Sequence, residues 1–257
     1  MASDRCYVYA IVDRSATLPH NLTGIKGEPL TLVSYRKLAA VISATSESRV
    51  QPRAALLVRH AAVIETICQI MRALPVRFGT VLPDAAAVNQ SLAERYDTLL
   101  ADLNRVGDKR EVGVTIFWES AEDSPDTNGA PHREHMANPS SAEVEGRGTR
   151  YLLKRREVYQ QDQAERDQAQ AIIAELDSNL GPLVYESRYS LRTTPRASVH
   201  AAYLAYPEGL TQVRNALASY QAIHHNTHRL IITGPWPPYS FVSASRGLIH
   251  MARNAEE

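Results

Sequence analysis

The sequence is poor in cysteine and has no net charge. It contains only two cysteines, Cys6 and Cys68, which are too few for a disulfide scaffold and for a closed zinc site without histidines. Its 28 Lys and Arg residues balance its 28 Asp and Glu residues, so it lacks the long-range positive field used in non-specific binding to nucleic acids or anionic membranes. We therefore expect buried, reduced thiols and neither a nucleic-acid nor a membrane partner.

Long hydrophobic runs and catalytic motifs are also missing. Arg, Glu or Pro interrupts each apolar stretch well before the roughly 20 residues that a membrane span needs, and the opening MASDRCYVYAIVDR lacks the arrangement of a signal peptide. The sequence has no phosphate loop, no Gly-x-Ser-x-Gly nucleophile and no complete dinucleotide-binding glycine pattern. These absences favour a cytosolic protein that is not an enzyme and needs no cofactor.

The apolar residues that are present suffice for two cores. Of 257 residues 44% are hydrophobic, which is typical of globular proteins, and the length exceeds that of most single domains. Residues 120–148 contain almost no large apolar side chain and are rich in Ser, Pro, Asn, Gly and Glu, which predicts a flexible linker. We expect an N-terminal domain over residues 1–119 and a smaller C-terminal domain over residues 149–257.

Both domains are predicted to be α+β. In the first, helices on one face of a mainly antiparallel sheet would give a ferredoxin-like α+β sandwich. In the second, a long helix with a polar middle is expected to be seated only by its last turns. The expected strands are 5–13, 30–34, 38–44, 74–83 and 111–119, then 184–192, 199–206 and 228–233; the expected helices are 52–71, 84–107, 149–180 and 210–223.

Two short segments are candidates for contact with a partner. Arg77, followed by Phe78, interrupts an apolar run, so its guanidinium either forms a structural ion pair or meets a partner. Near the C-terminus, prolines separate the large rings of Trp236, Tyr239 and Phe241. This segment is either a lid over its own domain or an aromatic docking ridge.

Three histidines offer the remaining candidate for chemistry. His224 and His228 are four residues apart, with His225 between them, and on one helix face this spacing can hold a metal ion. The glutamate and third ligand of a hydrolase are missing nearby, and basic residues at a solvated helix end explain the pattern equally simply. A metal-dependent enzyme is therefore only a remote alternative, and we predict no metal site.

Three motifs in order resemble one known family. They are Leu74-Pro-Val-Arg-Phe-Gly-Thr-Val81, Gly148-Thr-Arg-Tyr-Leu-Leu-Lys154 and Gly234-Pro-Trp-Pro-Pro-Tyr-Ser-Phe-Val242, and together with Tyr7-Val-Tyr-Ala-Ile-Val12 they resemble the gas vesicle protein F/L family over most of the chain. The compact chain and its short C-terminal tail are closer to F.

The resemblance implies an accessory or minor structural protein of gas vesicles, without a reaction or cofactor. Its implied partner is the major gas vesicle shell protein, and possible further partners are other accessory gas vesicle proteins. An assembly factor or nucleator in the cytoplasm is one reading, and a stoichiometric minor component of the finished vesicle wall is the other.

Overall fold

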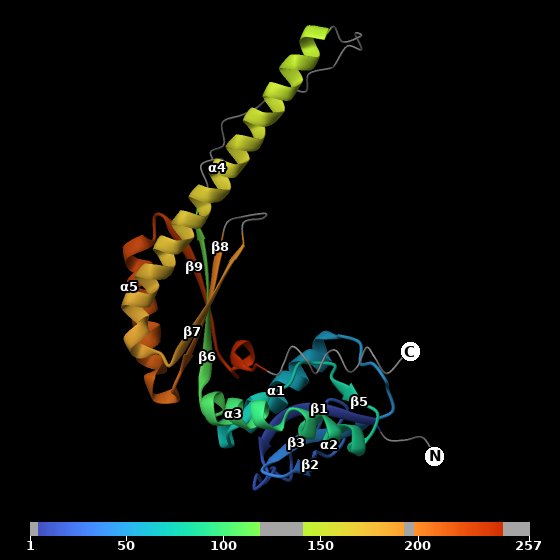
Figure 1. The fold of residues 1–257 in the computed structure, drawn as a ribbon. Coiled ribbons are helices and arrows are strands. Elements are labelled where there is room, and N and C mark those ends of the chain that lie inside the picture. Colours follow the sequence, from blue (N-terminus) through green and yellow to red (C-terminus); the bar gives the residue numbers. More distant parts are fainter. Residues whose placement is uncertain (1–4, 119–140, 193–197, 244–257) are drawn as a thin grey trace.

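The computed structural model describes residues 5–118, 141–192 and 198–243. These residues form two units, each built on its own antiparallel sheet (Figure 1). The N-terminal unit lies at the lower end of the view, and the second unit rises from it with one long helix projecting away from the body. The α+β class expected from the sequence is confirmed.

The first sheet is centred on β1, a strand rich in β-branched and aromatic residues. The strand order is β2-β3-β1-β4, and β5 also pairs with β1. Strands β2 and β3 form a hairpin: Tyr35 lies opposite Leu38, and Arg36 in the turn has a positive φ of 49°. The strands are β1 (Arg5–Asp13), β2 (Thr31–Tyr35), β3 (Leu38–Thr45), β4 (Ala73–Pro75) and β5 (Val81–Leu82).

Helices cover both faces of this sheet. Helix α1 (Ala54–Ile70) packs with Tyr7 and Tyr9 of β1, whereas α2 (Ala85–Glu94) and α3 (Tyr96–Val106) pack on the other side with Val8 and Ile11. Because successive side chains of a strand point to opposite faces, β1 is buried on both sides. The expectation that the helices share one face is wrong.

The helix expected from residue 84 to residue 107 is in fact two helices. Asp84 is the N-cap of α2, and its side chain accepts a hydrogen bond from the backbone N–H of Ala87 at 2.7 Å. Arg95 leaves the helical conformation, with φ −122° and ψ 14°, and separates α2 from α3. This break allows the apolar stripes of both helices to join one core with the sheet.

The second sheet contains the strand that the sequence analysis had assigned to the first. Strand β6 (Arg110–Trp118) lies between β8 (Ser198–Ala205) and β9 (His228–Trp236), and β7 (Glu186–Arg192) pairs with β8. With α4 (Ser141–Leu180) after β6 and α5 (Leu210–His224) after β8, the order is βαββαβ. Ferredoxin-like connectivity therefore belongs to the second unit, not to the N-terminal one. The sequence of a strand indicates how far it is buried, but it does not indicate which other strands pair with it.

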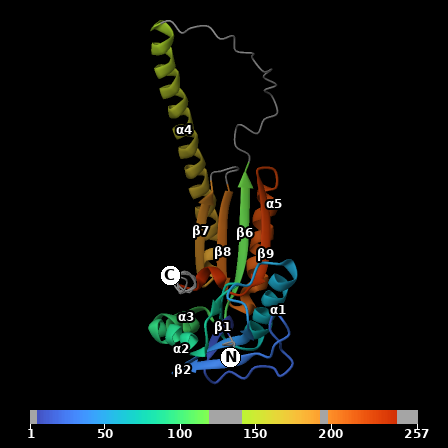
Figure 2. The same cartoon turned by 90° about the vertical axis from the view of Figure 1, so that its right-hand side faces the viewer.

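Helices α4 and α5 cover one face of the second sheet, and the described chain leaves the other face without a helix (Figure 2). The core between them contains Val114 and Ile116 of β6 and Val213 and Leu217 of α5. Among its described side chains, helix α4 contributes buried Ala169, Ile172, Leu176 and Leu180 from its last turns, and it projects beyond the sheet (Figure 1). The prediction of a long helix seated at one end is confirmed.

Helix α4 begins earlier than predicted. It starts at Ser141, inside the segment expected to be a linker, where alanine and glutamate favour a helix despite two glycines. The rest of that expected linker, residues 120–140, lies outside the described residues.

The two units share one apolar core at their junction. Leu204 of β8, Phe241 and Val242 belong to the same cluster as Leu99 and Leu103 of α3. Three short 3-10 helices lie in the second unit and at the junction: η1 (Gly181–Leu183), η2 (Pro207–Gly209) and η3 (Tyr239–Phe241). No helix in the described ranges has both the length and the apolar character needed to cross a membrane.

Candidate functional site

The proline-rich segment after β9 crosses the junction between the units. It begins at Gly234, whose φ of 101° is in the region that favours glycine, and a Cβ there would lie 2.7 Å from the carbonyl oxygen of Glu111. The Gly234–Pro235 peptide is cis. Pro237 and Pro238 are buried, and η3 follows them directly. Glycine and proline here direct the chain from the edge of the second sheet towards the first unit.

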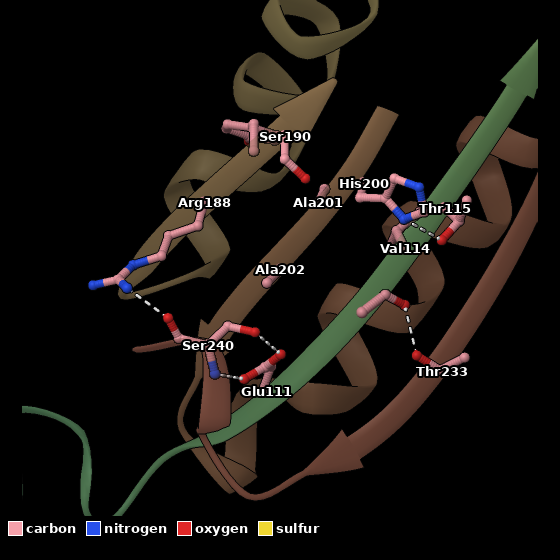
Figure 3. Close-up of a pocket in the computed structure, with 12 residues that line it drawn as sticks. Glu111, Val114, Thr115, Arg188, Ser190, His200, Ala201, Ala202, Thr233 and Ser240 are labelled. Atoms are coloured by element: carbon pink, nitrogen blue, oxygen red, sulfur yellow. Dashed lines mark hydrogen bonds between the residues drawn. The ribbon is translucent and has the colours of Figure 1, made fainter. Parts of the chain in front are cut away.

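A buried carboxylate holds η3 in place (Figure 3). Glu111, at the start of β6, is 8% exposed. Its Oε2 accepts a hydrogen bond from the backbone N–H of Ser240 at 2.8 Å, and its Oε1 accepts one from the Ser240 hydroxyl at 2.6 Å. The Ser240 carbonyl in turn accepts a hydrogen bond from Arg188 of β7. Two strands of the second sheet therefore position this one residue.

The N-terminal unit holds the same segment through Arg105 of α3. Its Nη2 donates to the carbonyl oxygen of Phe241 at 2.7 Å and to Asp102 at 2.8 Å, and its Nη1 donates to Glu186 of β7. Burial opposes the charge, but the hydrogen bond to Asp102 and the nearby Glu186 outweigh it, so the pKa of Arg105 is raised. Asp102 also accepts hydrogen bonds from the backbone N–H and hydroxyl of Ser243, at 2.7 and 3.0 Å. We call Asp102, Arg105, Glu111, Glu186, Arg188 and Ser240 the junction clasp.

Phe241 and Tyr239 point into the protein. Phe241 is fully buried, and the Arg188 guanidinium lies 5.1 Å from the centre of its ring. Tyr239 is half-buried and packs against the core of the N-terminal unit, where burial first, and then the neighbouring Cys68 and Tyr7, raise its pKa. Both rings pack with residues of the N-terminal unit rather than over the second unit alone, and a docking role for them stays a proposal.

Of the three large rings in this segment, Trp236 is the one whose side chain is exposed to solvent and could contact a partner. It is 50% exposed at the end of β9, and Ile231 and Ile232 of the same strand are 42% and 36% exposed. β9 pairs only with β6 among the described strands, so it is an edge strand, as its proline requires. We call Ile231, Ile232 and Trp236 the β9 apolar strip.

The Arg77–Phe78 segment is not part of this strip. Arg77 is exposed, so its guanidinium does not need the buried ion pair that the sequence analysis considered. Phe78 is half-buried and packs edge-on against His60, with ring centroids 5.5 Å apart, and against Tyr7 at 6.1 Å. Phe78 and Tyr239 both pack against the same N-terminal core. A role for Arg77 and Phe78 in partner binding stays a prediction.

The candidate metal ligands do not lie as the sequence suggested. Helix α5 ends at His224, and His228 opens β9, so the two histidines are not on one helix face. Their rings are stacked with centroids 5.0 Å apart, and His224 Nε2 lies 2.8 Å from Glu175 Oε1. Within the described ranges, no group of three His, Cys, Asp or Glu residues is arranged to hold a metal ion.

Both cysteines are buried, as predicted. Burial raises the pKa of the Cys68 thiol to about 12, which keeps it protonated at neutral pH. Cys68 therefore lacks the thiolate that a nucleophile needs.

Sequence reasoning did not find the junction clasp. Its bonds join residues far apart in the chain, such as Arg105 with Phe241 and Glu111 with Ser240. The available signal was local: Asp102 and Arg105 are three residues apart on a helix, a spacing that favours an ion pair on the surface. Nothing in that spacing indicates a second unit.

Known proteins resemble this chain over almost its whole length. The model of a family described as gas vesicle synthesis protein GvpL/GvpF matches residues 5–243. Among solved structures, the gas vesicle protein GvpF from Anabaena sp. PCC7120 is 21% identical, covers 94% of this chain and 97% of its own, and has a TM-score of 0.70. The GvpF structure from Microcystis aeruginosa is 20% identical, covers 94% and 100%, and has a TM-score of 0.71. At these identities the structures show a shared fold. A search of curated proteins gives no significant match.

Proposed function

Because the chain belongs to the gas vesicle synthesis protein GvpL/GvpF family, we propose that it binds the hydrophobic shell subunit of gas vesicles and supports vesicle assembly or nucleation. The proposal places the protein in the cytoplasm, associated with gas vesicles, and assigns it no reaction. The observation that carries the binding role is the β9 apolar strip, which exposes three large apolar side chains on one edge strand.

The two edges of the second sheet differ in chemistry. β7 carries the charged residues Glu186, Arg188 and Arg192, which discourage pairing with another strand. β9 carries Ile231, Ile232 and Trp236 instead, and its exposed stretch is charged only at Arg229. An apolar edge strand can accept an extended partner strand through its backbone and bind that strand's apolar side chains on both faces. β9 therefore fits an apolar partner much better than β7 does.

Binding of an apolar partner would also explain how this chain supports vesicle assembly. A shell subunit with exposed apolar strands or helices would aggregate before assembly, and covering those surfaces keeps it available. The β9 edge would be occupied until the subunit is transferred to the growing shell. Other accessory gas vesicle proteins are the further partners in this proposal.

The binding role is tested by changing the strip without touching the core. Trp236→Ala combined with Ile231→Lys removes the exposed ring and places a charge on the edge, and it should abolish co-purification of the co-expressed shell subunit. Val58→Ala is the matched control, because Val58 is 70% exposed on α1, away from the strip. Thermal unfolding must show that both variants fold. If the folded double variant still retains the shell subunit like the control, the strip is not the docking site.

A second double variant, Trp236→Ala with Tyr239→Ala, tests a docking role for the proline-rich segment in the same assay. If this variant folds and retains the shell subunit unchanged, that segment has no docking role.

The second reading, a stoichiometric minor wall component, predicts a different distribution. A wall component remains on washed, purified vesicles and resists mild detergent, whereas an assembly factor is lost. Quantifying the chain relative to the shell subunit on such vesicles separates the two. The remote metal-dependent enzyme requires bound metal in the purified protein, which elemental analysis measures.

A further inference from the structure

The open face of the second sheet is built by alternate residues of all four strands (Figures 2 and 3). Directly paired residues of antiparallel strands present their side chains on the same face, so the register defines rows of side chains across it. From β7 to β9, three of these rows are Arg188-Ala202-Gly113-Thr233, then Ser190-His200-Thr115-Ile231, then Arg192-Ser198-Phe117-Arg229. Helices α4 and α5 lie on the opposite face.

Small residues leave a groove in this face. Gly113 and Ala202 form its floor, and the groove has a volume of about 290 Å³. Arg188, Glu111 and Ser240 lie at one side of the floor, and His200 and Thr115 lie at the other (Figure 3). This volume is at the lower end of small-molecule pockets, which span about 300–1,000 Å³. The groove is therefore sized for a side chain of a docked partner rather than for a cofactor.

Charge on this face is one-sided. In the described chain this face has two carboxylates, Glu111 and Glu186, and both lie at the end near η3. Glu111 accepts hydrogen bonds from Ser240, and Glu186 forms ion pairs with Arg105 and Arg188. The other end of the face has exposed Arg192 and Arg229, whose neighbours in the row are Ser198 and Phe117. In a chain with no net charge, these cations form a local basic surface.

His200 joins the groove to the basic end of the face. Its Nδ1 lies 3.1 Å from the Thr115 hydroxyl, and its Nε2 lies 3.3 Å from the Ser198 hydroxyl. Burial and then the charge of Arg192 lower its pKa, so the ring is neutral at neutral pH and offers polar contacts without charge. The arginines therefore supply the charge on this face.

We propose that this open face is a second docking surface, which binds an acidic segment of a partner protein. Acidic residues of that segment would meet Arg192 and Arg229, which are exposed, whereas Arg188 is already paired with Glu186. This surface shares Ile231 with the β9 apolar strip, but the binding proposed here depends on the charges of Arg192 and Arg229 rather than on apolar contacts.

The face does not suit RNA as well as it suits an acidic peptide. RNA-binding sheets of this connectivity stack bases on aromatic side chains of their central strands. Here the central strands β6 and β8 present Gly113, Thr115, His200 and Ala202, and Phe117 is their one Phe, Tyr or Trp ring on this face. Phe117 and His200 are thus the two rings with which these strands could stack a base, and the RNA probe below tests that alternative.

Fluorescence anisotropy with the full chain tests the proposal. The probes are a labelled peptide that alternates Glu and Thr, a peptide of equal length that alternates Lys and Thr, and a single-stranded RNA of equal charge to the Glu peptide. At low salt the Glu peptide should bind best. Arg192→Ala with Arg229→Ala should weaken it roughly fivefold, since two exposed ion pairs of about 0.5 kcal/mol each are lost. Arg49→Ala with Arg53→Ala is the matched control, because it removes the same charge from exposed sites of the other unit.

A charge-reversal variant completes the test of this docking surface. Reversal of charge, Arg192→Glu with Arg229→Glu, should transfer the preference to the Lys peptide. The proposal is overturned if the Glu peptide does not bind at low salt, if both alanine pairs weaken it equally, or if the RNA binds more tightly through the same arginines. Co-purification of the shell subunit with the Arg192→Ala, Arg229→Ala chain is measured in parallel, so that failure of this surface is distinguished from failure of the β9 strip.

Discussion

Ser240 donates two hydrogen bonds to Glu111, from its backbone N–H at 2.8 Å and from its hydroxyl at 2.6 Å. The two residues lie on β6 and η3, which are far apart in the chain. Because Glu111 is only 8% exposed, its carboxylate has lost most of its hydration and depends on these donors and on the fold around them. The pair therefore anchors the end of the described chain to the start of the second sheet.

Replacing Glu111 by alanine should destabilise the protein by about 1–3 kcal/mol, because the N–H of Ser240 then loses its acceptor beside a buried surface. Ser240→Ala removes only the hydroxyl and should cost about 1 kcal/mol. Urea denaturation of the two variants and the parent measures both. Equal stability of Glu111→Ala and the parent would show that η3 is held by packing alone.

Arg105 connects α3 to β7 and η3, so its loss should uncouple the two units. Lysine at this position keeps the charge but cannot donate to Asp102, Glu186 and the Phe241 carbonyl together, and we expect a loss of about 2 kcal/mol. Both tryptophans, Trp118 and Trp236, lie in the second unit, so their fluorescence reports that unit alone.

The measurement compares tryptophan fluorescence with far-ultraviolet circular dichroism, which reports both units, during urea denaturation. The two transitions should coincide in the parent and separate in Arg105→Lys. Arg49→Lys is the control, because Arg49 is exposed in the N-terminal unit. Coincident transitions in Arg105→Lys would mean that the shared apolar core alone couples the units.

The sequence predicted individual elements better than their assembly. Apolar spacing located α1 and α5, and Asp84 marked a helix start, because these signals depend only on nearby residues. The partners of β6 were assigned wrongly because its alternating burial would suit a place in either sheet. Its pairing with β8 and β9 depends on strands that follow much later in the chain.

The candidate residues show the same limit. The sequence showed that Trp236, Tyr239 and Phe241 are large rings between prolines, but not which of them is exposed. That depends on η3, whose position is set by Glu111 and Arg105. For Arg77 the sequence left two alternatives open, a structural ion pair and a partner contact, and the exposed side chain removes the need for a buried ion pair.

His60 should make stability depend on pH. It is 3% exposed; its Nε2–H donates to the Val76 carbonyl at 3.1 Å, and its Nδ1 then accepts from the Tyr7 hydroxyl at 3.0 Å. Burial lowers its pKa from 6.5 to about 4, so the folded state keeps the ring neutral. The unfolded chain binds a proton at higher pH than the folded chain, and protonation therefore favours unfolding. The stability due to neutral His60 is complete above pH 6.5 and is lost as the pH falls towards 4.

The expected loss over this window is about 3 kcal/mol. The free energy of unfolding in urea, measured at several pH values from 7 to 4, tests it. His60→Gln is the comparison, because glutamine can also donate to Val76 and accept from Tyr7 but does not titrate. Its curve should be flatter than the parent curve in this window. Parallel curves would show that other groups cause the dependence.

Gly234 should tolerate alanine less well than Gly27. Both have positive φ, 101° and 86°, so alanine is strained at either position and should cost about 1 kcal/mol from conformation alone. At Gly27 nothing lies within 4 Å of an added Cβ, whereas at Gly234 it would lie 2.7 Å from the Glu111 carbonyl oxygen and 3.2 Å from the Trp236 ring. The Gly234→Ala backbone must move, and the loss should be larger by about 1–2 kcal/mol.

Because Gly234 lies between Ile232 and Trp236, its displacement should also disturb the β9 apolar strip. Gly234→Ala is therefore expected to weaken shell-subunit retention at a temperature where the variant remains folded, while Gly27→Ala retains it fully. Equal loss of stability in the two variants would mean that the chain relaxes around Gly234 without strain. Normal retention by a destabilised Gly234→Ala would instead show that docking does not need the precise path of the strand after Thr233.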